Sequence, residues 1–369
     1  EHVPPLRLSQ LRVTGAFLVI LIWVVLRNRP ALRLSRSEIV PLVLYGVLGI
    51  AVTQTLYLVT LSRMPIGIAL LGHPRVFHSP LGYGPVLNAA RTITTVHDLY
   101  ALTHPEWHPA RTVFFMQQTL PVVARRSTRV IVMSDHVRRD VVRELGVSPE
   151  RVTVIPLPVG HEFRPVPRDE ARAHVHRRFG LAGEYVLHVG TLEPRKNHVT
   201  LFAAYERMRR DGFTGPLVLV GHEGWRNEPI LRRLADSSAR AHILRVTDAD
   251  ERDLVALYGA STVVAFPSLE EGFGYPIIES MACGVPCVTG NVTAMAEVGA
   301  GYATLVPPTD ADALADALLA CWRDPSQRER AAVLGPERAA GHSFERWAAA
   351  TLAVYREELA LASRSDARA

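Results

Sequence analysis

Short apolar segments alternate with amphipathic helical segments from residue 75 to about residue 345, and this alternation most constrains the fold. Strands are expected at 76–79, 92–97, 129–133, 152–155, 185–190, 217–221, 242–245, 262–266 and 286–289. Helices are expected at 110–126, 135–145, 198–210, 227–236, 251–259, 276–283 and 310–322. A Pro-rich linker at 156–167 divides the pattern into two doubly wound α/β domains.

Composition narrows the class of protein. A chain of 369 residues is long enough for two domains, and 48% apolar residues exclude a mainly disordered chain. The formal charge of +5 suits anionic partners, but no basic run interleaved with aromatic residues argues for nucleic acid. Cys283, Cys287 and Cys321 lack metal-ligand spacing, so we expect buried thiols, a reducing compartment and no zinc site.

The first 72 residues differ from the rest in their hydropathy. Uncharged runs occupy 13–26 and 39–61, and the second is long enough to cross a bilayer, which takes about 20 apolar residues. Several arginines lie between the runs, as is typical of a cytoplasmic loop. Residues 1–72 are therefore expected to be a transmembrane-like helical segment, with a buried core helix as the alternative for either run.

This pattern resembles the second, third and start of the fourth helices of a drug/metabolite transporter superfamily protein. Its third apolar stretch, at 64–72, is too short to span a bilayer at about 1.5 Å per residue. A chain that crossed only through 39–61 would place the residues after 72 on the side of the membrane opposite to the basic loop. A natural fusion and a gene model that joins two fragments both remain open.

Residues 268–286 place Glu271 and Glu279 around a glycine turn that opens a short helix. Gly272 and Gly274 let the backbone approach a ligand closely. Free N–H groups at such a helix start attract an anion such as a diphosphate, and a carboxylate one turn further can accept hydrogen bonds from a ribose diol. The layout indicates a site for a sugar carried on a nucleotide, although two glutamates at this spacing also occur on solvated helix faces.

The same segment resembles the Glu-x7-Glu signature of retaining glycosyltransferases, specifically glycosyltransferase family 4, whose GT-B fold has two Rossmann-type domains. Residues 185–197 resemble the first strand and phosphate loop of that family's donor domain, and 294–299 and 305–310 match its closing elements. The resemblance covers about residues 74–350. It implies transfer of a sugar from a nucleotide-diphosphate sugar to an acceptor hydroxyl in glycan or glycolipid synthesis, without a bound metal.

The resemblance also assigns candidate site residues. The catalytic candidates are His97, Asp98 and Glu271, and the donor-binding candidates are Gly190, Arg195, Lys196, Gly272, Phe273, Gly274 and Glu279. His97 is implied to lie against the transferred sugar and Glu271 to reach its hydroxyls. Arg195 and Lys196 follow a strand end and are expected to neutralise the departing diphosphate, while Glu279 holds the ribose. A surface charge pair and a structural histidine are the alternatives.

We expect a transmembrane-like segment at 1–72, a partial acceptor-side domain with its linker at 73–167, a donor-binding domain at 168–345, and a C-terminal helix with a frayed tail at 346–369. The acceptor-side domain is expected to lack its earlier half. Two functions follow. One is a membrane-associated hexosyltransferase that acts at the cytoplasmic side on a glycan or lipid-linked acceptor, and the resemblance of its loop favours mannose as the sugar. The other is a catalytically inactive fusion of a nucleotide-sugar-binding domain with transporter-like membrane helices.

Overall fold

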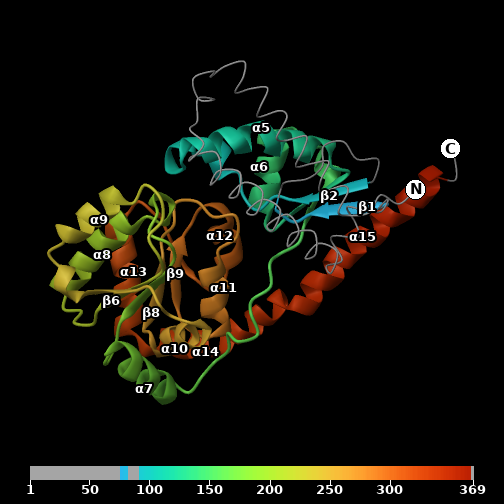
Figure 1. The fold of residues 1–369 in the computed structure, drawn as a ribbon. Coiled ribbons are helices and arrows are strands. Elements are labelled where there is room, and N and C mark those ends of the chain that lie inside the picture. Colours follow the sequence, from blue (N-terminus) through green and yellow to red (C-terminus); the bar gives the residue numbers. More distant parts are fainter. Residues whose placement is uncertain (1–74, 82–90, 367–369) are drawn as a thin grey trace, which may run out of the picture. The chain divides into compact units, whose positions relative to one another are not determined.

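The computed structural model describes residues 75–81 and 91–366 (Figure 1). The expected transmembrane-like segment at 1–72, with its runs at 13–26 and 39–61, lies outside these residues. Among the residues that are described, no helix is both long and apolar enough to cross a membrane. Residues His78–Ala369 form one compact unit, and the described residues of the chain include two sheets.

The first sheet and its helices are termed the N-lobe. Among the described residues, its four strands lie in the order β1-β2-β3-β4, and the β2–β3 and β3–β4 pairs are parallel. The strands are β1 (Val76–Ser79), β2 (Arg91–Thr95), β3 (Arg129–Val132) and β4 (Val152–Val154). The helices are α4 (Tyr100–Thr103), α5 (Ala110–Arg126) and α6 (Asp135–Leu145). Ser134 caps α6 by accepting a hydrogen bond from the Val137 N–H at 3.2 Å, as expected of a helix-capping serine.

The second sheet and its helices are termed the C-lobe. Its six strands lie in the order β10-β9-β8-β5-β6-β7, and all of the adjacent pairs are parallel. The strands are β5 (Val186–Val189), β6 (Leu217–Val220), β7 (Ile243–Val246), β8 (Val263–Phe266), β9 (Cys287–Gly290) and β10 (Thr304–Val306). The helices are α7 (Arg168–Phe179), α8 (His198–Arg210), α9 (Glu228–Ala235), α10 (Glu251–Ala260), α11 (Tyr275–Ala282), α12 (Thr293–Gly299), α13 (Ala311–Arg323) and α14 (Pro325–Ala339).

The order of the C-lobe strands positions the site. The chain passes outward through β5, β6 and β7 and then returns to place β8 on the other side of β5. In open α/β sheets, ligands bind beyond the carboxyl ends of the strands at such a reversal. The loops that follow β5 and β8 therefore meet at the expected binding position.

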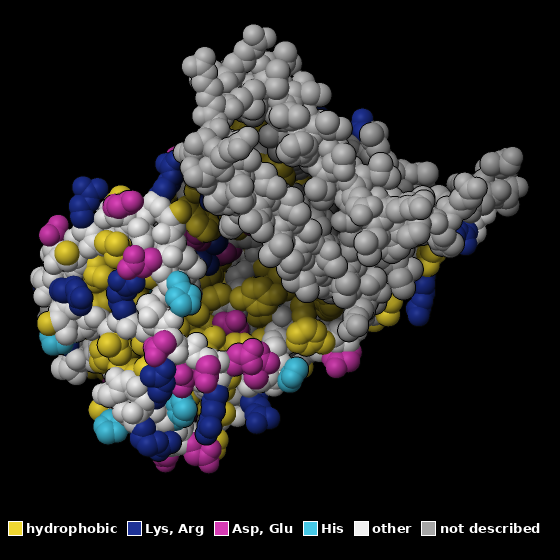
Figure 2. All heavy atoms as spheres, in the orientation of Figure 1, with side chains coloured by type: hydrophobic (Ala, Val, Ile, Leu, Met, Phe, Trp, Pro, Cys, Tyr) yellow, Lys and Arg dark blue, Asp and Glu magenta, His cyan; other side chains and the backbone are white. Residues whose placement is uncertain are grey.

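The central strands of the C-lobe sheet have the continuous apolar sequence of buried parallel strands. Every residue of β6 (Leu-Val-Leu-Val) and of β8 (Val-Val-Ala-Phe) is buried, as is usual where helices cover both faces of a sheet. The helices expose charges of both signs, which are interspersed over the face of the C-lobe in Figure 2. The expected α/β architecture with two Rossmann-type sheets is confirmed.

The long helix α15 (Phe344–Asp366) returns from the C-lobe to the N-lobe sheet (Figure 1). Its Glu358 carboxylate is 1% exposed and accepts hydrogen bonds from Arg91 Nε at 2.7 Å and from the Thr128 hydroxyl at 2.6 Å. Arg129 Nε lies 3.4 Å from the same carboxylate. The last seven residues, 363–369, were expected to form a frayed tail. This expectation is wrong for 363–366, because the helix continues to Asp366.

Replacing Glu358 by glutamine is expected to lower the free energy of unfolding by about 3 kcal/mol, because two guanidinium groups lose their buried partner. Glu357→Gln is the matched control. Its carboxylate is 62% exposed and lies 3.1 Å from Arg129 Nη2, so its loss is expected to cost less than about 1 kcal/mol. Urea unfolding at pH 7 measures both changes. Equal effects of the two substitutions would contradict the anchoring role of Glu358.

Candidate active site

The loop after β5 carries two of the predicted donor-binding cations. Pro194–Lys196 forms a single 3-10 turn, and Asn197 follows in the left-handed conformation with φ 58°. Asn197 is fixed there because its Nδ2 donates to the carbonyl of Pro267 at 3.0 Å and to that of Pro308 at 2.6 Å. The turn thus holds the cations of residues 195–196 against the loop after β8.

Glu271 lies between these two cations. Its Oε1 is 2.7 Å from Lys196 Nζ, and its Oε2 is 2.5 Å from Arg195 Nη1. Arg195 Nη2 also bonds to Glu193 Oε1 at 2.6 Å. Burial alone would raise the pKa of Glu271, but the charges of Lys196 and Arg195 bring that pKa below its usual value. The structure therefore brings together three predicted site residues as a buried group of ion pairs.

Aromatic rings flank both cations. Lys196 Nζ lies 4.8 Å from the centre of the Phe266 ring, at the end of β8. The Arg195 guanidinium lies 4.9 Å from the ring of Tyr100, which belongs to the N-lobe. Gly190 packs beside the Lys196 stem, since a Cβ at this glycine would lie 3.4 Å from Lys196 Cδ. These contacts hold the cations in defined positions.

The glycine loop after Glu271 touches the N-lobe directly. A Cβ at Gly272 would lie 2.2 Å from the carbonyl oxygen of His97, so only glycine fits. The Gly272 carbonyl also accepts a hydrogen bond from the Ser134 hydroxyl at 2.7 Å. Gly274 has φ 106° and begins α11, and the ring of Phe273 is buried with its centre 5.7 Å from that of His342.

His97 and Asp98 follow the end of β2 and face this loop through the backbone. The His97 side chain is exposed, and its Nε2 lies 2.9 Å from the Pro80 carbonyl oxygen. Burial raises the pKa of Asp98, against the opposing effect of the Arg195 charge. Asp98 of the predicted His-Asp pair therefore lies near Arg195, one of the predicted donor-binding cations.

Glu279 lies apart from the ion pairs of Glu271. It is on α11, and its Oε2 accepts a hydrogen bond from the Tyr258 hydroxyl at 2.6 Å. Burial raises the pKa of Glu279 to about 7, although the hydrogen bond from Tyr258 acts in the opposite direction. The pKa values of the two glutamates of the motif are thus shifted in opposite directions.

Glu279→Gln is expected to remove a pH dependence of stability. The ordinary pKa of this carboxyl is 4.5, so between pH 4.5 and about 7 the unfolded chain loses the proton first. Stability therefore falls as pH rises through this range, by about 2–3 kcal/mol. Glutamine cannot ionise. The free energy of unfolding of the variant, measured with urea, should therefore rise relative to that of the wild type between pH 5 and pH 8. The exposed Glu329→Gln serves as the control, and an unchanged pH profile in Glu279→Gln would refute the assignment.

Sequence reasoning missed several residues of this region. No local sequence pattern marks Tyr100, Glu193 or Tyr258 as a site residue. Their positions beside Arg195 or Glu279 are known only from the folded structure. Glu297 lies in a segment that the sequence analysis did quote, 294–299, but without an assigned role. Its two carboxylate oxygens accept hydrogen bonds from the first N–H groups of α6, at 3.0 Å from Asp135 and 3.2 Å from His136.

Comparisons with known proteins agree with this geometry. A family model described as "Glycosyl transferases group 1" matches residues 183–324, and one described as "Glycosyltransferase Family 4" matches residues 29–163. O-antigen chain mannosyltransferase B of Escherichia coli is 32% identical over 285 residues, which cover 76% of this chain and 74% of that protein. The chain belongs to glycosyltransferase family 4. It is a retaining glycosyltransferase that takes its sugar from a nucleotide-sugar donor, without a metal cofactor.

Other relatives of this glycosyltransferase have related names and folds. A D-inositol 3-phosphate glycosyltransferase from Frankia alni is 32% identical over 252 residues, covering 64% of this chain and 60% of that protein. Sucrose-phosphate synthase from Thermosynechococcus elongatus matches with a TM-score of 0.66 and 23% identity, over 91% of this chain and 82% of the other. Anabaena HepE in complex with UDP-glucose matches with a TM-score of 0.62 and 19% identity, over 72% of each chain. The two structural matches show the GT-B fold.

The comparisons correct the expectation for the N-terminal residues. The family 4 model begins at residue 29, so it covers the basic loop and the run at 39–61 that were expected to belong to a transporter fragment. Nothing in the comparisons supports a transporter-like segment. The inactive fusion with transporter helices therefore has no support, while the missing earlier half of the acceptor-side domain stays a prediction.

Proposed function

We propose that the phosphates of a nucleotide-sugar donor bind between the loop at residues 190–197 and the start of α11. Arg195 and Lys196 stand beyond the end of β5, beside the reversal in strand order. The helix start after Gly274 adds N–H groups that favour an anion. The observation that carries this proposal is the buried group of ion pairs that Glu271 makes with both cations.

Glu271 has two roles in this proposal. Without a donor, it neutralises Arg195 and Lys196, which are 16% and 11% exposed and need a buried counter-charge. When a diphosphate arrives, its oxygens share these cations, and the carboxylate becomes available to hydroxyl groups of the sugar. Glu279, one turn into α11, accepts hydrogen bonds from the hydroxyls of the ribose diol.

The N-lobe contributes the acceptor side of the reaction. The backbone of His97 packs against Gly272, so the His97 side chain stands next to the loop that would hold the sugar. Asp98 lies near Arg195 and orients the adjoining backbone by accepting from the Tyr100 N–H at 3.4 Å. We therefore assign donor binding to residues 168–345 and acceptor binding to the N-lobe.

The reaction develops negative charge on the leaving phosphate while the sugar ring becomes oxocarbenium-like. Arg195, Lys196 and the start of α11 stabilise that charge, and each preorganised contact of this kind is worth about 3 kcal/mol. The acceptor hydroxyl approaches on the face that the phosphate leaves, and its proton passes to the leaving oxygen. This same-face path retains the configuration at the anomeric carbon.

We propose a hexose, and specifically mannose, as the transferred sugar, with a glycan or lipid-linked chain as the acceptor. The support is the similarity to O-antigen chain mannosyltransferase B and to a serotype-specific mannosyltransferase of Escherichia coli. The second of these is 28% identical over 215 residues, which cover 26% of its length. Peripheral association with the cytoplasmic face of a membrane follows if the acceptor is lipid-linked.

Two measurements on the purified full chain test the proposed function. Calorimetry with GDP and UDP is expected to show one binding site, and labelled mannose from GDP-mannose is expected to reach a mannan-type oligosaccharide. NMR of the product should show the anomeric configuration of the donor. Binding without turnover on any glycan would leave a donor-binding protein and refute the acceptor role of the N-lobe, and absence of nucleotide binding would refute the whole proposal.

A further inference from the structure

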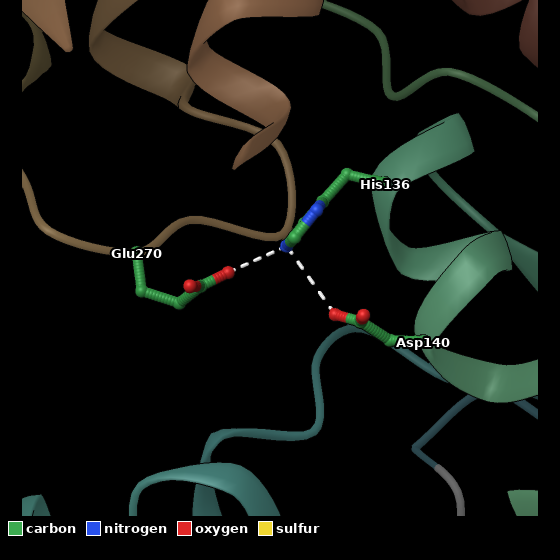
Figure 3. Close-up of side chains that lie close together, drawn as sticks. All are labelled: His136, Asp140 and Glu270. Atoms are coloured by element: carbon green, nitrogen blue, oxygen red, sulfur yellow. Dashed lines mark hydrogen bonds and ion pairs between the residues drawn. The ribbon is translucent and has the colours of Figure 1, made fainter. Parts of the chain in front are cut away.

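A second group of polar side chains bridges the two lobes beside the donor-binding loop (Figure 3). His136 and Asp140 belong to α6 of the N-lobe, and Glu270 belongs to the C-lobe loop after β8. His136 Nε2 lies 2.5 Å from Glu270 Oε1 and 3.3 Å from Asp140 Oδ2. One nitrogen and two carboxylate oxygens therefore lie within 4.8 Å of one another.

The local structure holds the side chains of His136, Asp140 and Glu270 in these positions. His136 and Asp140 are four residues apart on a helix, so their side chains share one face. The start of α6 is held by Ser134, which bonds to Gly272, and by Glu297. The three converging side chains are only 13–17% exposed, which places them in the seam between the lobes.

Arg143 and Arg195 contact Asp140 and Glu270 through atoms other than the carboxylate oxygens that face His136. Arg143 Nη2 bonds to Asp140 Oδ1 at 2.6 Å, whereas it is the other oxygen of Asp140 that faces His136. Arg195 Nη1 bonds to the backbone carbonyl of Glu270 at 3.0 Å and not to its side chain. The atoms that face one another are thus one imidazole nitrogen and two carboxylate oxygens.

The donor set selects a class of ion. Mg²⁺ and Ca²⁺ prefer oxygen ligands alone, whereas an imidazole combined with carboxylates suits Zn²⁺, Co²⁺ and similar cations. We propose that His136, Asp140 and Glu270 bind a divalent transition-metal cation that links the two lobes. The ion takes no part in sugar transfer. The site is therefore independent of the proposed function and can be tested without a sugar donor or an acceptor. Without the ion, His136 Nε2 pairs with the same two carboxylates.

Cobalt titration of the full chain tests this site through visible absorption, with zinc calorimetry in parallel. One ion is expected per chain, and His136→Gln is expected to weaken binding at least tenfold. Asp140→Asn and Glu270→Gln should weaken it in the same direction. His174→Gln is the matched control, because His174 Nε2 pairs with Asp253 Oδ1 at 2.6 Å but belongs to no three-ligand group among the described residues.

Hydrogen exchange provides a second measurement on the same samples. Zinc should slow exchange in residues 133–145 and 267–274 of the wild type but not of His136→Gln. Circular dichroism confirms that each variant is folded. The proposal is overturned if no ion binds at 1 mM, if His136→Gln binds as tightly as the wild type, or if bound zinc leaves exchange unchanged in both segments.

Discussion

Replacement of Lys196 by methionine is expected to lower kcat for sugar transfer about a hundredfold or more. Lys196 is held 2.7 Å from Glu271 and over the Phe266 ring, so its charge is preorganised for the leaving phosphate. Loss of one such contact is worth about 3 kcal/mol, which corresponds to a factor of about a hundred in rate. Methionine keeps the apolar stem, and Glu271 retains its pairing with Arg195.

Steady-state transfer kinetics and nucleotide calorimetry check this expectation together. Arg233→Met is the matched control, since Arg233 bonds to Glu206 at 2.6 Å within the same lobe but lies on α9. It should leave kcat unchanged. The role of Lys196 would be refuted by wild-type kcat in Lys196→Met, and an equal loss in Arg233→Met would show that any lost ion pair in this lobe has the same effect.

Gly272→Ala is the second large expected effect, again a loss of about a hundredfold in transfer. The added Cβ would lie 2.2 Å from the His97 carbonyl oxygen, a backbone atom that cannot rotate away. Either the glycine loop or the end of β2 must move by roughly 1 Å, and a displacement of that size between reacting groups costs about a hundredfold in rate. The bond from Ser134 to the Gly272 carbonyl would be strained as well.

Gly341→Ala provides the control for this substitution. A Cβ at Gly341 would meet nothing closer than Arg346 Nη1 at 3.8 Å, which is an ordinary contact. The control is expected to keep wild-type kcat. Since the conflict in Gly272→Ala lies between the lobes, nucleotide binding should fall less than transfer does. Unchanged transfer in Gly272→Ala would show that the two loops need not touch during the reaction.

Local signals in the sequence were sufficient for several elements. The helices expected at 110–126 and 135–145 have the same bounds in the structure. For the second of these, both ends are encoded locally, because Ser134 caps the first turn and Gly146 ends the helix in the left-handed conformation. Most C-lobe strands are also found within one residue of their expected bounds, as continuous apolar runs predict.

Other elements depend on packing that no local signal reveals. The sequence analysis did not expect α14, which contains Gly335 and Pro336, residues that usually argue against a helix. A Cβ at Gly335 would lie 2.4 Å from the Met281 carbonyl, so close packing on α11 requires the glycine. Likewise α7 was not expected, because Ala171 and Val175 are its only buried residues.

Hydropathy alone does not distinguish a membrane span from a segment buried in protein, for a physical reason. An uncharged run as long as 39–61 is compatible with a membrane, but also with strands and helices buried inside an α/β domain. Hydropathy measures only the preference for leaving water and does not distinguish lipid from protein core. The family 4 match from residue 29 gives no support to a transporter fragment in this region.

The sequence by itself determined the α/β alternation and which strand ends carry cations, glycines and glutamates, because strand periodicity and loop composition are local properties. Its resemblance to glycosyltransferase family 4 supplied the expected activity. Only the tertiary structure decided which of these groups meet. Lys196 pairs with Glu271, which lies 75 residues further along the chain. Ser134 donates a hydrogen bond to Gly272, 138 residues further along and in the other lobe. Contacts at such separations depend on strand order and on how closely two backbones can pack, and neither is encoded in any single segment.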